Sequence, residues 1–173
     1  VLIDDVDIAT LNRVKLRRSI GYVMQHAGLL PHRKVIDNVG TVLRLNGVDK
    51  KEARERSYAV LETVGLDASV ATKYPGQLSG GQQQRVGVAR GLVTDPNILL
   101  MDEPFGAVDP IVRDELQQEL LRLQRELDKT IVFVTHDIDE AFLLGDQVVI
   151  LKQGGHIAQV GSPADILAEP ADD

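Results

Sequence analysis

Short apolar runs alternate with amphipathic segments of helix length along this sequence, and this alternation limits the fold more than any other feature. Runs this short, without polar alternation, are typical of strands buried in a parallel sheet. Four stand out, namely SIGYVMQ at 19–25, NILLMD at 97–102, TIVFVTH at 130–136 and QVVILK at 147–152. Between the second and third, leucines recur on one helical face at Leu116, Leu120, Leu123 and Leu127. The pattern predicts a βαβ unit in an α/β fold with a mostly parallel sheet.

Residues 34–73 break this alternation, because their apolar positions follow a helical spacing without an intervening strand. Two helices are expected there, each followed by a glycine that ends it. The positions are Val35, Val39 and Val42 before Gly47, and Ala53, Val60, Leu61 and Val64 before Gly65. We therefore expect a small helical insert within an α/β core.

Charge and composition narrow the classes of partner. The net charge of −7 over 173 residues argues against nucleic acid or an anionic membrane as the main partner, since both need clustered Lys and Arg. The sequence has no cysteine, which fits a reducing compartment such as the cytoplasm. Its longest apolar runs are far shorter than the roughly 20 residues that cross a bilayer. If membranes are involved, we expect another subunit to span them.

Two adjacent carboxylates, Asp102 and Glu103, end the second apolar run, and Pro104 follows them. Like charges this close raise each other's pKa unless a cation or a reacting centre lies between them. The pair therefore predicts a cation site at the end of a buried strand.

A glycine pair lies shortly before this strand, in the segment YPGQLSGGQQQRVGVARGLV at 74–93. Ser79, Gly80 and Gly81 are expected to open a helix, where backbone N–H groups and the absence of side chains suit a phosphate. The simpler alternative is an N-cap preceded by a flexible turn.

Together these motifs resemble the ATP-hydrolysing subunits of ABC transporters. The matching stretches are GYVMQ (21–25), LSGGQ (78–82), ILLMDEP (98–104), AVDP (107–110) and VTHD (134–137). The resemblance implies a RecA-like P-loop NTPase core with an inserted helical subdomain. Residues 1–27 and 84–173 would form the core, and residues 28–83 the helical subdomain that ends in LSGGQ.

The resemblance also implies roles for the residues at the second and third strands. Asp102 would hold Mg²⁺, Glu103 would orient and deprotonate the attacking water, and Gln25 would reach both the Mg²⁺ and the water. His136 would donate a hydrogen bond to the γ-phosphate of ATP. Simpler alternatives are a turn-capping role for Asp102, plain solvation for Glu103, and a packing role for His136 between strand and helix.

Other residues would act between two subunits. The family's signature, here Ser79, Gly80, Gly81 and Gln82, contacts ATP bound to a second ATPase subunit in a head-to-tail dimer. Asp109 would act across the same interface. The Q-loop and helical subdomain would meet transmembrane permease subunits at the cytoplasmic face of the membrane, and a substrate-binding protein would take part indirectly.

The segment LRRSIGYVMQHAGLLPHRKVIDNV resembles the subgroup that imports osmoprotectants such as glycine betaine, choline or carnitine. One alternative is a soluble ABC-type ATPase that does not take part in transport. Another is a catalytically silent binding module that presents LSGGQ to a partner subunit. The sequence contains no Gly-Lys pair, hence no G-x-x-x-x-G-K-[ST] loop to cradle phosphates. We therefore expect an N-terminally truncated subunit that lacks the first strands of its core and, by itself, does not hydrolyse ATP.

Overall fold

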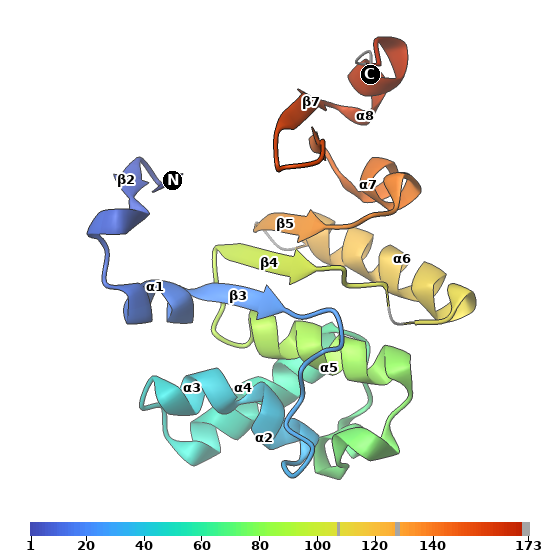
Figure 1. Ribbon diagram of the computed structural model, residues 1–173. Helices are drawn as coiled ribbons and strands as arrows, with labels where there is room; N and C mark the ends of the chain where they lie inside the picture. Colours follow the sequence, from blue (N-terminus) through green and yellow to red (C-terminus); the bar gives the residue numbers. More distant parts are fainter. Residues whose placement is uncertain (107, 127–128, 171–173) are drawn as a thin grey trace. The chain divides into compact units, whose positions relative to one another are not determined.

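The computed structural model describes residues 1–106, 108–126 and 129–170. The chain divides into two compact units, Val1–Val134 and Thr135–Asp173 (Figure 1). Ala107 of the AVDP motif and Leu127 of the leucine face lie outside the described residues. The predicted division into 1–27 with 84–173, and 28–83, stays a prediction.

The first unit is built on a parallel sheet of β3 (Ile20–Val23), β4 (Ile98–Asp102) and β5 (Thr130–Val134), in the order β3-β4-β5. The strands predicted at 19–25, 97–102 and 130–136 are thereby confirmed. Side chains alternate between the two faces of a strand. Val23, Leu99 and Met101 are buried on one face, whereas Tyr22 and Val132 are exposed on the other.

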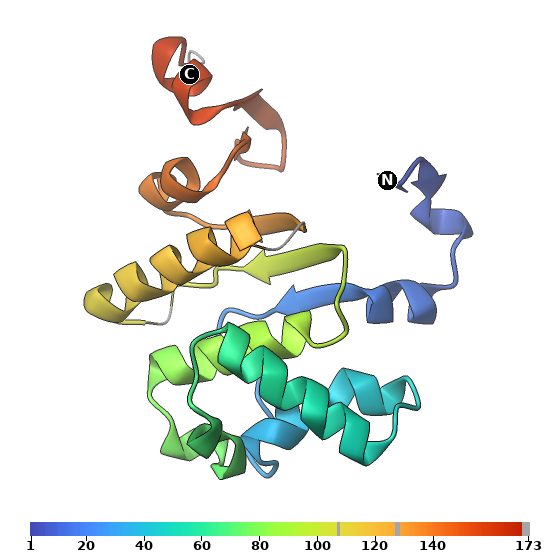
Figure 2. The ribbon, with the colours of Figure 1, turned by 180° about the vertical axis from the view of Figure 1, so that it is seen from behind.

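Two long helices, α5 (Gly80–Leu92) and α6 (Pro110–Glu126), cover the face of the sheet that holds Met101. The leucine face is confirmed in α6, where Leu116, Leu120 and Leu123 are buried. The helices α2 (Val35–Val39), α3 (Thr41–Leu45) and α4 (Lys50–Thr63) lie on the side of α5 away from the sheet (Figures 1 and 2).

The predicted helix through Val35, Val39 and Val42 is two short helices, because the chain bends at Gly40. A Cβ at Gly40 would lie 3.0 Å from Oγ of Ser57 in α4, so the bend lets α4 approach closely. The glycine stops are confirmed at Gly47 (φ +85°) and Gly65 (φ +70°), where the left-handed conformation favours glycine.

The remaining elements of the first unit are short. They are the antiparallel pair β1 (Leu2–Ile3) and β2 (Val6–Asp7), the helix α1 (Arg13–Ser19), and the 3₁₀ turns η1 (Ile8–Thr10), η2 (Ala68–Thr72) and η3 (Pro75–Gln77).

The second unit contains α7 (Ile138–Leu144), β6 (Val148–Leu151), β7 (Ile157–Gly161) and α8 (Pro163–Ala168). The strand predicted at 147–152 is confirmed as β6. It pairs antiparallel with β7, which the sequence analysis did not predict. Across residues 1–106, 108–126 and 129–170, no helix has the length and apolar character needed to cross a bilayer.

Candidate functional site

The acidic pair lies where β4 ends, and the backbone there is tightly constrained. Asp102 is the last residue of β4, and the amide of Glu103 donates to the carbonyl of Val134 at 2.9 Å. Glu103 has φ +42°, a left-handed conformation that costs a non-glycine residue roughly 1–2 kcal/mol. The turn closes when the Gly106 amide donates to the Glu103 carbonyl at 3.1 Å. The backbone of Glu103 is therefore held on both sides, by β5 and by the turn that follows.

Each carboxylate accepts a hydrogen bond from a neutral side chain of the segment around the end of β3. The Gln25 amide, Nε2, donates to Oε2 of Glu103 at 2.6 Å. The Tyr22 hydroxyl donates to Oδ2 of Asp102 at 3.5 Å, the long limit of a hydrogen bond. The structure thus brings together Gln25, Asp102 and Glu103, as the sequence analysis expected.

Two residues that the sequence analysis missed complete this cluster, namely Tyr22 and Gly106. A Cβ at Gly106 would lie 3.3 Å from Nε2 of Gln25 and 3.3 Å from Oε2 of Glu103, so any larger residue would crowd the pair. The glycine's position, three residues after the acid, was the available signal for its role. Tyr22 carried no such signal, because an aromatic residue in a strand usually means packing.

The helix α5 begins at the serine and glycine residues that the sequence analysis selected. Ser79 is the N-cap: its Oγ accepts from the Gln82 amide at 3.2 Å, and Oε1 of Gln82 accepts from the Ser79 amide at 3.1 Å. This reciprocal capping box satisfies donors at the helix start. Ser79 and Gly80 are exposed, whereas Gly81 is buried.

Gly81 has a packing role within the chain. A Cβ there would lie 2.3 Å from Cγ1 of Val112 in α6, closer than two carbon atoms can approach. A side chain at this position would meet Val112 before it met a ligand, so the glycine is required by the contact between α5 and α6.

Asp109 caps α6. Its Oδ1 accepts from the amides of Ile111 at 3.1 Å and Val112 at 3.2 Å. Its side chain is exposed, and its role across a dimer interface stays a prediction.

His136 belongs to the second unit and is described within it. It is exposed and lies between Thr135 and the N-cap of α7, Asp137, whose Oδ1 accepts from the amides of Asp139 and Glu140. The Thr135 hydroxyl donates to Oε2 of Glu140 at 2.6 Å. Asp137 thus caps α7 directly after His136, and the contact of His136 with a phosphate stays a prediction.

The acids offer oxygen ligands of the kind that Mg²⁺ prefers. Among the residues that the structure describes, no three His, Cys, Asp or Glu side chains are grouped closely enough to hold a metal. Mg²⁺ commonly takes only one or two carboxylates and completes its shell with water and substrate phosphates. Asp102 is exposed at the end of β4, with oxygens of Glu103 and Gln25 nearby, and this donor set fits Mg²⁺ that arrives with a nucleotide.

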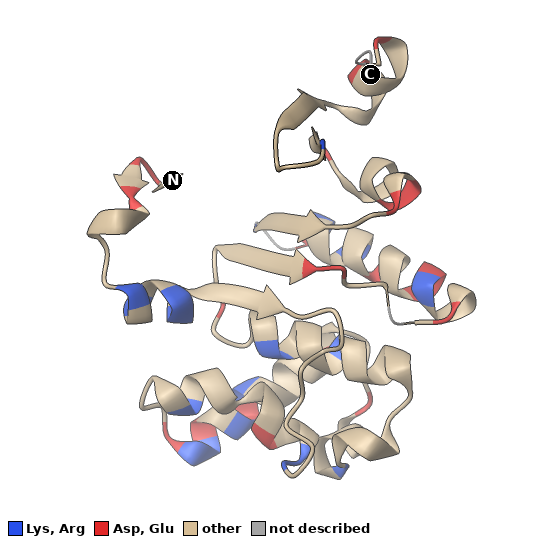
Figure 3. Cartoon of the chain, in the orientation of Figure 1, with Lys and Arg blue, Asp and Glu red and all other residues tan. Residues whose placement is uncertain are grey.

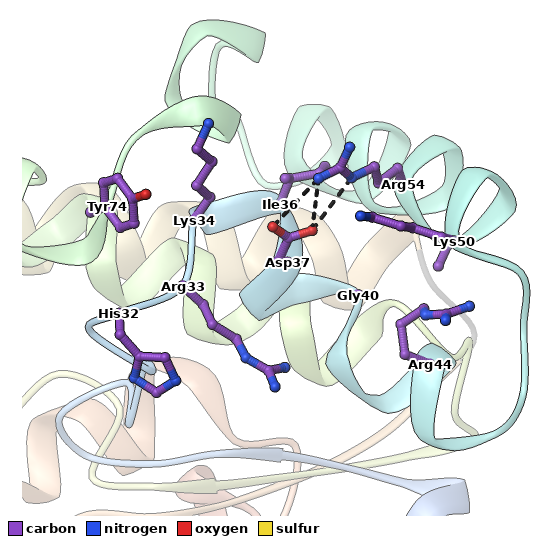
Figure 4. Close-up of a pocket in the computed structure, with 11 residues that line it drawn as sticks. His32, Arg33, Lys34, Ile36, Asp37, Gly40, Arg44, Lys50, Arg54 and Tyr74 are labelled. Atoms are coloured by element: carbon purple, nitrogen blue, oxygen red, sulfur yellow. Dashed lines mark hydrogen bonds and ion pairs between the residues drawn. The ribbon is translucent and has the colours of Figure 1, made fainter.

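A separate open pocket of about 540 Å³ lies on the helical part of the first unit (Figure 4). Five Lys or Arg residues line it against one acid, Asp37, which pairs with Arg54 at 3.1 Å. The cationic residues are Arg33, Lys34, Arg44, Lys50 and Arg54. Figure 3 shows Lys and Arg around α2 to α4 together with Asp and Glu, whereas the lining of this pocket holds a single acid. The pocket is therefore suited to an anionic partner.

Comparison with known proteins identified related sequences and structures. The family model described as "ABC transporter" matches residues 1–106. The whole chain aligns with the Bacillus subtilis choline transport ATP-binding protein OpuBA at 50% identity, and the alignment covers 45% of that protein. It also aligns over its whole length with the Escherichia coli glycine betaine/proline betaine transport system ATP-binding protein ProV. The identity is 47%, and the alignment covers 44% of that protein. The chain thus spans about half the length of these curated relatives.

Two solved structures share its fold. CbiO1 from Clostridium perfringens, part of the ABC transporter complex cbiONQ, superposes with a TM-score of 0.85 at 33% identity, over 97% of this chain and 67% of that one. A dimeric, post-hydrolysis structure of the ATP-binding cassette MJ0796 with ADP and Pi superposes with a TM-score of 0.78 at 34% identity. The match covers 93% of this chain and 72% of that one.

Proposed function

This chain belongs to the ABC transporter family, and from that premise we propose that it is part of the ATP-binding subunit of a membrane importer, where it binds and hydrolyses ATP. The observation that carries the proposal is the hydrogen bond from Gln25 to Glu103, directly beside Asp102. This places an amide, a candidate base and a candidate metal ligand together at the carboxyl ends of parallel strands, where ligands bind in open α/β sheets.

Each side chain has a distinct part in the proposed reaction. Asp102 would hold Mg²⁺, and the bound ion would supply positive charge to the phosphates. Glu103 would accept the proton of the attacking water. Gln25 orients that carboxylate through its amide. His136 donates a hydrogen bond to the γ-phosphate.

We propose that a second ATPase subunit completes the site. The exposed Ser79 and Gly80 at the start of α5 are accessible to a phosphate held by a partner, and helix N-termini favour anions. Asp109 would lie at the same head-to-tail interface. Support comes from the solved dimer of MJ0796 with ADP and Pi, which shares this fold.

The proposed membrane partner is a permease subunit that meets the helical part of the chain at the cytoplasmic face. The basic pocket in Figure 4 would receive an acidic cytoplasmic segment of that permease. We propose that the cargo is a quaternary-ammonium osmoprotectant such as glycine betaine or choline, delivered by a substrate-binding protein. Support for the cargo comes from the names of the relatives, which are choline and glycine betaine transport proteins.

The test uses the full-length protein and the variant Glu103→Gln. We expect Mg²⁺-dependent ATP hydrolysis in the unmodified protein, and a loss of turnover of about 10²–10⁴-fold in Glu103→Gln, because a general base acts mainly on the transition state. The dissociation constant for ATP should change little. Glu115→Gln is the matched control, since it neutralises an exposed carboxylate on α6 away from the cluster.

The outcomes separate the alternatives. Equal losses of ATP affinity and of turnover in Glu103→Gln would exclude a general-base role for Glu103. ATP binding without any hydrolysis in the unmodified protein would favour the silent module that presents LSGGQ. Hydrolysis that does not respond to a reconstituted permease would favour an ATPase outside transport.

A further inference from the structure

One face of α5 lies against the backbone of β3 and of the segment that follows it. The contacts come from positions 84, 87, 90 and 91, which share a helical face. Nε2 of Gln84 donates to the carbonyl of Met24 at 3.5 Å, and a Cβ at Gly21 would lie 2.4 Å from the carbonyl oxygen of Gly91. The segment 21–28 therefore lies directly on the helix that begins at Ser79.

Arg90 makes the strongest contacts of this face. Its Nη1 donates to the carbonyl of Gly28 at 2.7 Å, and its Nη2 donates to the carbonyl of Ala27 at 2.5 Å. The guanidinium is half-buried, and burial lowers its pKa. A buried charge needs such partners, and a planar fork of donors suits two adjacent carbonyls.

The two carbonyls belong to residues in an unusual conformation. Ala27 has φ +56° and Gly28 has φ +54°, so two consecutive residues are left-handed. Such a conformation is unfavourable for alanine and persists only where the surroundings impose it. Arg90 supplies that constraint from α5.

Gly87 allows the loop to approach the helix. A Cβ at Gly87 would lie 3.1 Å from Cβ and 3.2 Å from Cα of Ala27, which is tighter than ordinary packing. The glycine and the arginine thus act on the same residue, one by leaving space and the other by binding its carbonyl.

We propose that Arg90 is a positioning residue for ATP hydrolysis. By fixing Ala27 and Gly28 on α5, it fixes the backbone two residues after Gln25 and so the amide that holds Glu103. The same rigid helix begins at Ser79, roughly 16 Å from Arg90 at 1.5 Å per residue. Arg90 therefore links the start of α5 to the Gln25–Glu103 pair. This inference rests on the function proposed above.

The first test compares Arg90→Gln with Arg85→Gln in the full-length protein. Arg85 is the matched control, because it also lies on α5 and donates to a backbone carbonyl, that of Val64 rather than one of residues 27 and 28. We expect kcat of Arg90→Gln to fall by about 10 to 100-fold, since small displacements of positioned groups have effects of this size. The KM for ATP should change less than about threefold, and Arg85→Gln should keep both values.

The second test measures the loop directly. The 173 residues contain no cysteine, so a spin label on His26→Cys, an exposed position beside Gln25, is the one labelled site within them. Any cysteine elsewhere in the full-length protein is replaced by serine first. We expect the label to become more mobile in Arg90→Gln and to stay unchanged in Arg85→Gln. Arg90→Lys should be intermediate in both label mobility and kcat, because a lysine lacks the fork that binds both carbonyls.

A further variant, Gly87→Ala, covers the case in which Arg90→Gln does not fold. Its methyl group displaces Ala27 while Arg90 is kept, and we expect a lower kcat with a more mobile label. The proposal would be overturned if Gly87→Ala and Arg90→Lys both had the kcat and the label mobility of the unmodified protein. It would also be overturned if Arg90→Gln and Arg85→Gln had the same kcat and the same label mobility. Absence of hydrolysis in the unmodified protein would count against the proposed function, and label mobility would still decide the role of Arg90 in holding the loop.

Discussion

Replacement of Asn38 by alanine is expected to be among the most damaging single changes to the helical part of the chain. Asn38 lies in α2 with 0% of its surface exposed. Its Oδ1 accepts from the amide of Leu30 at 2.7 Å, and its Nδ2 donates to the carbonyls of Leu30, Arg33 and Lys34 at 3.0–3.2 Å. One buried amide therefore holds the loop that connects the Gln25 segment to the basic pocket.

The magnitude follows from the number of hydrogen bonds. Nδ2 has two hydrogens, so its contacts with three carbonyls count as two hydrogen bonds. The hydrogen bond that Oδ1 accepts brings the total to three. Each bond contributes about 1 kcal/mol, and each buried group left without a partner costs about 1–3 kcal/mol. We expect Asn38→Ala to lower the free energy of unfolding by about 3–5 kcal/mol, a large part of the 5–15 kcal/mol that is typical of a domain.

The assay is urea unfolding followed by circular dichroism, with hydrogen exchange of the Leu30 amide as a local probe. A loss of about 4 kcal/mol would lower the urea midpoint by about 2 M at a slope of about 2 kcal/mol/M. Asn46→Ala is the control, because Asn46 is exposed at the end of α3 and its change should stay within about 0.5 kcal/mol. A loss below about 1 kcal/mol for Asn38→Ala, with Leu30 still protected from exchange, would refute this reasoning.

Three further predictions follow from the site and its supports. His136→Ala should nearly abolish ATP hydrolysis by the full-length protein and weaken its ATP-dependent dimerisation, because it removes the proposed hydrogen bond to the γ-phosphate. Unchanged hydrolysis would leave His136 a packing role. Gly81→Ala should lower the free energy of unfolding by about 1–3 kcal/mol through its clash with Val112, and adding Val112→Ala should recover part of this loss; additive losses in this double-mutant cycle would contradict the contact. The backbone amide of Lys51 lowers the pKa of Asp49, so that carboxylate stabilises the fold above its ordinary pKa of 3.8 and the contribution disappears as the pH falls through its lower folded value. Asp49→Asn should therefore lower the free energy of unfolding slightly at pH 7, and it should remove part of the further loss of stability below about pH 4. An unchanged acid limb would exclude this contribution.

The sequence by itself determined the elements and the candidate residues. Strand and helix periodicities depend on neighbours in the chain, so the four predicted strands and the helices α4 and α6 are where the pattern placed them. Caps are equally local, and Ser79 begins a helix as expected. The resemblance to ABC transporter ATPases is confirmed for the same reason, since its motifs are contiguous stretches of sequence.

Only the tertiary structure decided which residues distant in the sequence meet. Gln25 and Glu103 are 78 positions apart, and their hydrogen bond depends on the pairing of β3 with β4 and on a left-handed residue that no pattern indicates. The split of the helix at Gly40 depends on Ser57, and the need for glycine at position 81 depends on Val112. In each case a contact between separate elements outweighs a local preference, because close packing leaves room for one arrangement of side chains and periodicity cannot specify it.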